Sequence, residues 1–136
     1  MKRSGMGFIF VLLLLLPRAG GAAAGAPGDP NKQILAALTS GDAKALSAYL
    51  NDRVDLGVGG TEGTYSRVQA TRILEEFFSK NPVKSVKINR QGTSSGGSYF
   101  SLGEMQAGSK TYRLYYLMKQ VNGAELIHLL QIQDTK

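Results

Sequence analysis

The second half of the chain is dominated by β-type hydrophobic patterning. After Pro82, four runs rich in β-branched, aromatic and aliphatic residues follow one another, separated by turn-forming residues: 83–90, 99–106, 111–120 and 125–133. Gly108-Ser109 and Asn122-Gly123 are two-residue hairpin signals, because these residues tolerate positive φ. The last three runs are therefore expected to form an antiparallel meander.

The last two of these runs carry apolar side chains on both faces. In run 111–120, one face carries Tyr112, Leu114, Tyr116 and Met118, and the other carries Arg113, Tyr115 and Leu117. In run 125–133, one face carries Leu126, His128, Leu130 and Ile132, and the other carries Ile127 and Leu129. A core needs only one such face, and an apolar second face usually marks a contact. We therefore expect either that two copies form a homodimer through this face of the sheet, or that the N-terminal helices cover part of it. The interface candidates are Arg113, Tyr115, Leu117, Ile127 and Leu129.

The first half of the mature chain has the signals of three helices. Asp29 and Pro30 are suited to begin a first helix that ends at Gly41, and Asp42 can cap a second. Ser66 and Gln69 form a capping box. The helix that they begin ends at Asn81-Pro82 and carries one apolar stripe: Ala70, Ile73, Leu74, Phe77 and Phe78. Residues 53–58 alternate as a strand, and Tyr65 closes a second short strand.

The N-terminus has the features of a cleavable signal peptide. Lys2 and Arg3 precede an apolar run, 8–16, and Ala22-Ala23-Ala24 supplies a cleavage site. The run is about half the ~20 residues that a membrane-spanning helix needs. We therefore expect an exported protein, periplasmic or extracellular, without stable membrane insertion after cleavage. The expected parts are a signal peptide (1–24), a short flexible linker (25–28) and a single domain (29–136).

Composition excludes several classes of function. The chain has no cysteine and one histidine, so it has no disulfide framework, no lipoprotein signal and no ligand set for a metal site. The net charge is +6, and loss of Lys2, Arg3 and Arg18 with the signal peptide leaves +3. The remaining cations are scattered, which argues against nucleic-acid binding. No cofactor is expected.

The order of these elements predicts an α+β fold, with three helices packed on one face of an antiparallel sheet. This pattern resembles the nuclear transport factor 2-like, or cystatin-like, fold, which implies a strongly curved sheet that wraps one long helix and leaves a conical pocket. Seven stretches carry a closer resemblance: Ala36, Leu38 and Thr39; Gly41-Asp42-Ala43-Lys44; Glu62-Gly63 with Tyr65-Ser66; 77–82; 112–117; 121–123; and 126–128. Through them the chain resembles a family of small exported bacterial domains of unknown function. These are mainly caps, turns and core positions, so no catalytic motif is implied.

Enzymes of this fold such as ketosteroid isomerase pair a carboxylate base with a tyrosine and a protonated acid in the cone. Asp55 and Tyr65 are the nearest candidates here. However, Asp55 alternates with apolar neighbours, which predicts the polar side of its strand, and Tyr65 is placed to pack before a helix. His128 lies among aliphatic residues, as a core or pocket-wall histidine does. No catalytic residue is therefore predicted.

An aromatic set could line the predicted cone or simply fill it. The pocket candidates are Tyr49, Tyr65, Phe77, Phe78, Tyr112, Tyr116 and His128. The leading hypothesis is a non-enzymatic exported domain that binds a small apolar ligand or a protein partner. The alternatives are a small hydrolase or isomerase acting in the cone, and a structural role in an envelope assembly.

Overall fold

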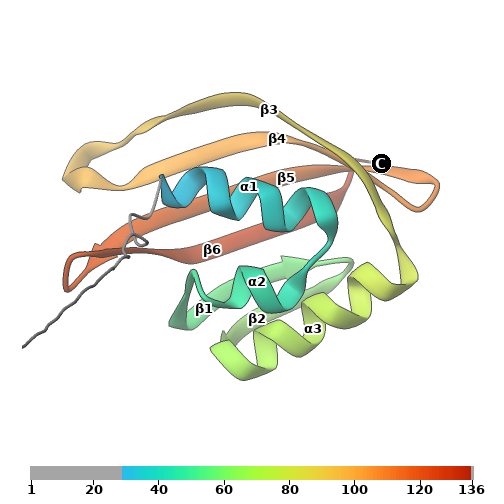
Figure 1. Cartoon of the computed structure of the whole chain (residues 1–136), viewed down its shortest axis with the longest axis horizontal. Coiled ribbons are helices and arrows are strands. Elements are labelled where there is room, and N and C mark those ends of the chain that lie inside the picture. The colour runs from blue at the N-terminus through green and yellow to red at the C-terminus, as the bar shows by residue number, and fades with distance from the viewer. Residues whose placement is uncertain (1–28, 136) are drawn as a thin grey trace, which may run out of the picture.

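The computed structural model describes residues 29–135, which form helices and one β-sheet (Figure 1). The predicted signal peptide (1–24) and linker (25–28) lie outside the described residues. The helices are α1 (Pro30–Ser40), α2 (Ala43–Ser47) and α3 (Arg67–Lys80). The strands are β1 (Leu50–Val58), β2 (Thr61–Ser66), β3 (Val83–Thr93), β4 (Tyr99–Ala107), β5 (Lys110–Val121) and β6 (Ala124–Asp134). The predicted α+β class is confirmed.

The helix ends follow the local signals in the sequence. The Asp29 carboxylate accepts a hydrogen bond from the Asn31 backbone N–H at 3.0 Å, and the Asp42 carboxylate caps α2 in the same way. Ser66 and Gln69 form the predicted capping box at the start of α3. Gly41 ends α1 with φ at 66°, a left-handed conformation that glycine adopts without steric cost.

The sheet has the strand order β2-β1-β6-β5-β4-β3. Four of its pairs are antiparallel, as predicted, but β1 and β6 are parallel. The sheet is therefore mixed rather than wholly antiparallel. The reason is topological: α3 carries the chain from β2 to the far edge at β3, and three hairpin reversals then bring β6 back in the direction of β1.

The β5–β6 hairpin has the predicted turn. Asn122 and Gly123 have φ values of 51° and 84°, which is the two-residue turn that matches the twist of an antiparallel pair. Asn122 is the one described non-glycine residue with positive φ.

The pairing of β3 with β4 contains a bulge and an unusually close backbone contact. Asn89 is an extra residue in β3, between the pairs Ile88↔Gly103 and Arg90↔Leu102, and such bulges bend and twist a strand. A Cβ atom at Gly103 would lie 2.1 Å from the Lys87 carbonyl oxygen. Only glycine permits this approach of the two backbones.

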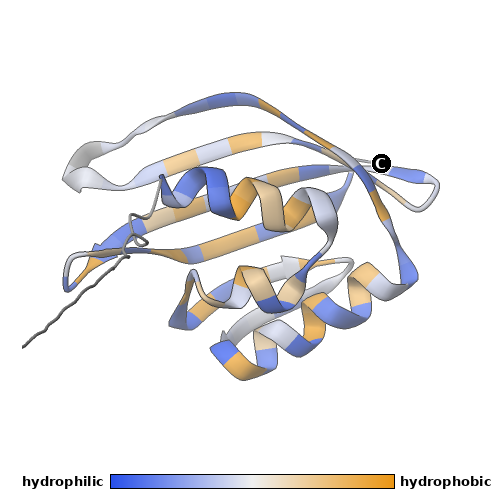
Figure 2. Cartoon of the chain, in the orientation of Figure 1, coloured by the Kyte–Doolittle hydropathy of each residue, from blue (hydrophilic) through white to orange (hydrophobic). Residues whose placement is uncertain are grey.

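All three helices lie on one face of the sheet (Figure 1). Hydrophobic and hydrophilic positions alternate along the strands (Figure 2), and the hydrophobic set facing the helices forms the core. Its largest fully buried side chains are Tyr116, Ile34, Leu38, Leu46, Leu50, Leu74, Met105, Leu114, Met118, Ile127, Leu130 and Ile132. We call the face that turns away from the helices the outer face.

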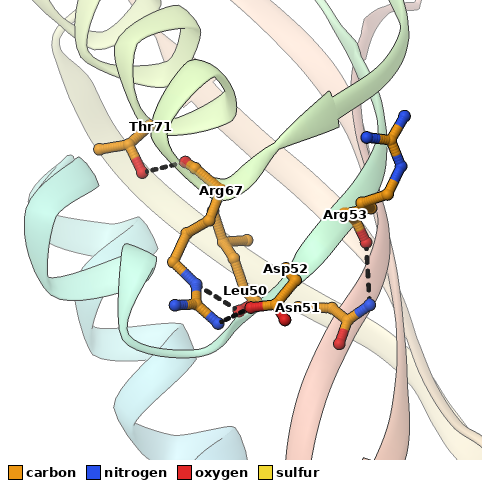
Figure 3. A network of polar contacts seen from close by, with 6 residues as sticks. All are labelled: Leu50, Asn51, Asp52, Arg53, Arg67 and Thr71. Atoms are coloured by element: carbon orange, nitrogen blue, oxygen red, sulfur yellow. Dashed lines mark hydrogen bonds and ion pairs between the residues drawn. The ribbon is translucent and has the colours of Figure 1, made fainter.

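Arg67 fastens the start of α3 to the start of β1 (Figure 3). Its Nε donates to the Leu50 carbonyl oxygen at 3.0 Å, and its Nη2 lies 2.9 Å from Asp52 Oδ1. Asp52 is 87% exposed, so the ion pair adds little. The bond to Leu50 lies at the point where the β1–β6 register is broken, and it positions α3 against the sheet.

Candidate functional site

The predicted pocket aromatics fall into separate groups. Phe77 packs edge-to-face on Phe78 and Tyr112, with ring centroids 5.7 and 5.2 Å apart. All three are buried in the core. Tyr49 and Tyr65 are partly buried and pack against the core elsewhere. The set therefore does not surround one common cavity.

Tyr116 is fully buried and donates a hydrogen bond from its hydroxyl to Asn31 Oδ1 in α1. Burial raises the pKa of its phenol, because the charged phenolate would lose its hydration. The residue therefore joins the sheet to α1 as a neutral hydrogen-bond donor.

A cleft lies at the C-terminal end of α3. Its volume is about 270 Å³, just below the range of roughly 300–1,000 Å³ that holds typical small ligands. Phe77 and Tyr112 are the predicted pocket residues that line it. Its polar lining includes Lys80, whose ammonium is held by Glu76 at 3.1 Å. Tyr116, the predicted pocket residue deepest in the core, does not line the cleft.

The outer face carries two rows of side chains that cross the whole sheet in register. One row, which we call the Arg90–Glu62 row, contains Arg90, Leu102, Tyr115, Gln131, Gly57 and Glu62. The adjacent row contains Gly92, Phe100, Leu117, Leu129, Asp55 and Thr64. Directly paired residues lie on the same face of a sheet, so each row is a line of neighbouring side chains.

The middle of these two rows is apolar. Five partly exposed side chains meet there, and we call them the outer patch: Phe100, Leu102, Tyr115, Leu117 and Leu129. The Phe100 and Tyr115 rings stack with their centroids 6.5 Å apart. The described helices leave this face open (Figure 1), so the alternative in which they cover it is not what the structure has.

The two sides of these rows carry opposite charges. Arg90 is exposed on β3 at the end of its row, whereas Asp55 and Glu62 are exposed on β1 and β2. Beside the acidic end, a depression of about 230 Å³ lies over Gly57, with Asp55, Glu62 and Leu129 in its wall. Along these two rows the outer face is therefore apolar in the middle, with Arg90 at one side and Asp55 and Glu62 at the other.

Ile127 lies in the core and not on the outer face. It is paired with Met118, whereas Leu129 is paired with Leu117, so His128 is an extra residue in β6. This bulge shifts the alternation by one residue. The prediction that Ile127 shares a face with Leu129 is therefore wrong, and Ile127 is fully buried.

His128 lies near charged groups of the outer face. Burial and the positive charge of Lys119 lower its pKa, while Asp55 acts in the opposite direction. Its Nε2 atom is buried without a hydrogen-bond partner among the described residues. A neutral imidazole is therefore favoured.

The acid/base candidates are separated by the sheet. Asp55 is paired with Thr64, and Tyr65 with the buried Val54. Because successive residues of a strand point to opposite faces, Asp55 lies on the outer face and Tyr65 on the helix side. The Asp55 carboxylate accepts a hydrogen bond from the Thr64 hydroxyl at 2.6 Å. The two side chains are not brought together.

Comparison with known proteins assigns the chain to a family. The family model described as "Domain of unknown function (DUF4783)" matches residues 31–133. The chain belongs to the DUF4783 family. A family structure from Bacteroides uniformis ATCC 8492 is 25% identical, with a TM-score of 0.74, and covers 79% of this chain and 99% of its own. No curated protein matches the chain.

Two more distant structures place this DUF4783 domain in a wider fold class. A protein from Nostoc punctiforme with a cystatin-like fold is 12% identical, with a TM-score of 0.62, over 78% of this chain and 73% of its own. An NTF2-like protein from Cytophaga hutchinsonii is 14% identical, with a TM-score of 0.55, over 76% and 85%. These comparisons confirm the predicted nuclear transport factor 2-like fold. They also confirm that the chain resembles a family of unknown function.

Two further findings concern the described part of this DUF4783 domain, residues 29–135. No helix there is long and apolar enough to cross a membrane. No three histidine, cysteine or acidic side chains within that range come close enough together to hold a metal ion.

Sequence reasoning missed two members of the outer patch. Phe100 and Leu102 lie directly across from Leu117 and Tyr115. The signal was available, because the two residues alternate with the buried Ser101 and Gly103 in run 99–106. Their place in the same rows became clear only from the strand order.

Proposed function

We propose that this DUF4783 domain is an exported, non-enzymatic binding domain that works as a homodimer through the outer face of its sheet. Export rests on the N-terminal sequence: two basic residues, a short apolar run and an Ala-rich cleavage site. Binding rests on the outer patch.

The outer patch is the single observation that carries this proposal. Five large apolar side chains lie in two adjacent, registered rows on a face that no described helix covers. Scattered apolar residues on a surface need no explanation, but a contiguous patch marks a contact. Its aromatic members also suit a self-association surface, since aromatic residues are enriched in interfaces.

The interior favours this surface over a ligand in the cone. Phe77 and Tyr112 are the predicted pocket residues that line the cleft beside α3, whereas Tyr116 is buried and held by Asn31. An apolar ligand larger than this cleft would have to displace packed core residues, and disruption of core packing costs several kcal/mol.

Native mass spectrometry tests the proposal on protein that begins at Gly25 and contains every described helix and strand. The unmodified protein is expected at twice the monomer mass. Leu117→Glu places a charge in the outer patch and is expected to give monomers. The matched control is Val68→Glu, because Val68 is 64% exposed on α3; this variant is expected to remain a dimer.

Thermal unfolding followed by circular dichroism checks that both variants are folded. A Leu117→Glu variant that is folded and still dimeric would refute the proposal. A monomeric unmodified protein that carries a reproducible extra mass would favour the small-ligand hypothesis instead.

A further inference from the structure

The charges at the two ends of the Arg90–Glu62 row have no ionic partner inside the described chain. Ion pairs among residues 29–135 join Arg67 to Asp52, Lys80 to Glu76 and Lys110 to Asp134. Arg90 is paired across strands with Leu102. The Glu62 carboxylate accepts a hydrogen bond from the neutral Gln133 amide at 3.1 Å, which leaves its charge uncompensated.

Arg90 and Glu62 cannot reach each other within one copy. Four strands separate β3 from β2, and at about 4.8 Å per strand the two backbones lie about 24 Å apart along the sheet. A second copy of the chain is therefore needed to bring the two side chains together.

Two limiting arrangements place a pair of outer patches face to face about a two-fold axis. If the axis runs across the strands, each end of the sheet lies over the same end of the second copy. With that axis between the two rows, acidic Glu62 and Asp55 approach the same acidic pair of the second copy, and Arg113 approaches Lys119. If the axis runs along the strands, β3 lies over β2 of the second copy, and Arg90 lies over Glu62.

With the axis along the strands, the Arg90–Glu62 row lies over its own copy in reversed strand order. Leu102 on β4 then faces the depression over Gly57 on β1. Leu117 faces Leu129, and Phe100 faces Asp55. Each contact occurs twice, as two-fold symmetry requires.

We propose that two copies pair about a two-fold axis along the strands, with Arg90 of each copy bound to Glu62 of the other. This inference rests on the proposed function, because it assumes that the outer faces meet. It adds the orientation, which the apolar patch alone leaves open. Charges at the ends of an interface fix register and exclude wrong arrangements.

A charge-exchange experiment tests the orientation. Arg90→Glu and Glu62→Arg each place two pairs of like charges in the homodimer. Each variant alone is expected to weaken dimerisation by about tenfold or more, measured by sedimentation velocity over a concentration series. An equal mixture of the two variants is expected to form a heterodimer about as tight as the unmodified dimer, because both pairs are then unlike.

The controls reverse the same charges away from the outer face: Lys44→Glu on α2 and Glu75→Arg on α3, both exposed. These variants should dimerise as the unmodified protein does, alone and when mixed.

The outcomes separate the two proposals. Restoration in the mixture supports the orientation. If single variants dimerise normally, or if their mixture stays weak, the orientation is wrong although the outer face can still be the interface. If the unmodified protein is monomeric at every concentration, the proposed homodimer itself fails, and the orientation fails with it.

Discussion

His128 occupies the extra position of the β6 bulge, and its environment favours the neutral imidazole. Burial and Lys119 lower its pKa, so the unfolded chain binds the proton more tightly than the folded chain. The histidine therefore contributes stability above its ordinary pKa of about 6.5, and that contribution is lost as the pH falls toward the lowered value.

The expected result is a melting temperature that falls more steeply between pH 7.5 and about pH 5.5 in the unmodified protein than in His128→Gln. The reason is that glutamine has no proton to bind in this range. Thermal scans at several pH values on both proteins provide the measurement. Parallel pH profiles would show that His128 is not responsible for the pH dependence.

For single residues, the sequence predicts on which face of the sheet most side chains lie. The bulge at His128 explains why this prediction is wrong for Ile127. Strict alternation along 125–133 places His128 with Leu130 and Ile127 with Leu129. One extra residue reverses the direction on its N-terminal side. Nothing in the local sequence marks the bulge, because both neighbours of His128 are aliphatic.

Among the elements, the close approach of β3 to β4 at the bulge depends on one glycine. A Cβ atom at position 103 would collide with backbone, namely the Lys87 carbonyl oxygen at 2.1 Å. Backbone cannot move aside as a flexible side chain can, so the two strands would have to move apart.

Gly103→Ala is therefore expected to lower the free energy of unfolding by about 3 kcal/mol or more, in the range of severe point mutations. The measurement is urea denaturation. The control is Gly92→Ala on the same strand pair, where a new Cβ atom would meet only the Phe100 ring, at 3.3 Å; its expected effect is within about 1 kcal/mol. Equal effects at both positions would contradict the proposed dependence on Gly103.

Local elements could be predicted from the sequence, and long-range pairing could not. Caps at Asp29, Asp42 and Ser66 and the Asn122-Gly123 turn are set by neighbouring residues. In contrast, the parallel β1–β6 pair joins segments separated by most of the domain. The contact of Arg67 with Leu50 was missed for the same reason, since Arg67 has the position of an ordinary exposed helix residue in the sequence.

On the scale of the whole molecule, the two faces of the sheet have different roles. The helix side is filled by its own side chains and stabilises the fold, with Tyr116 hydrogen-bonded to α1. Along its two registered rows the outer face is apolar in the middle, with Arg90 at one side and Asp55 and Glu62 at the other. The alternation of residues within each strand predicts part of the candidate site from the sequence. The two complete rows could not be predicted, because they depend on the order of the strands in the sheet.

Hydroxyl-radical footprinting of the protein from Gly25 onward, over a range of concentrations, tests the outer-face interface most directly. As dimers form, oxidation of Phe100, Tyr115 and Leu117 is expected to fall about threefold or more, as occurs when partly exposed side chains become buried at an interface core. Oxidation of exposed Val68 on α3 should not change. Unchanged oxidation of the outer patch at concentrations where dimers are present, or protection of α3 instead, would contradict the account.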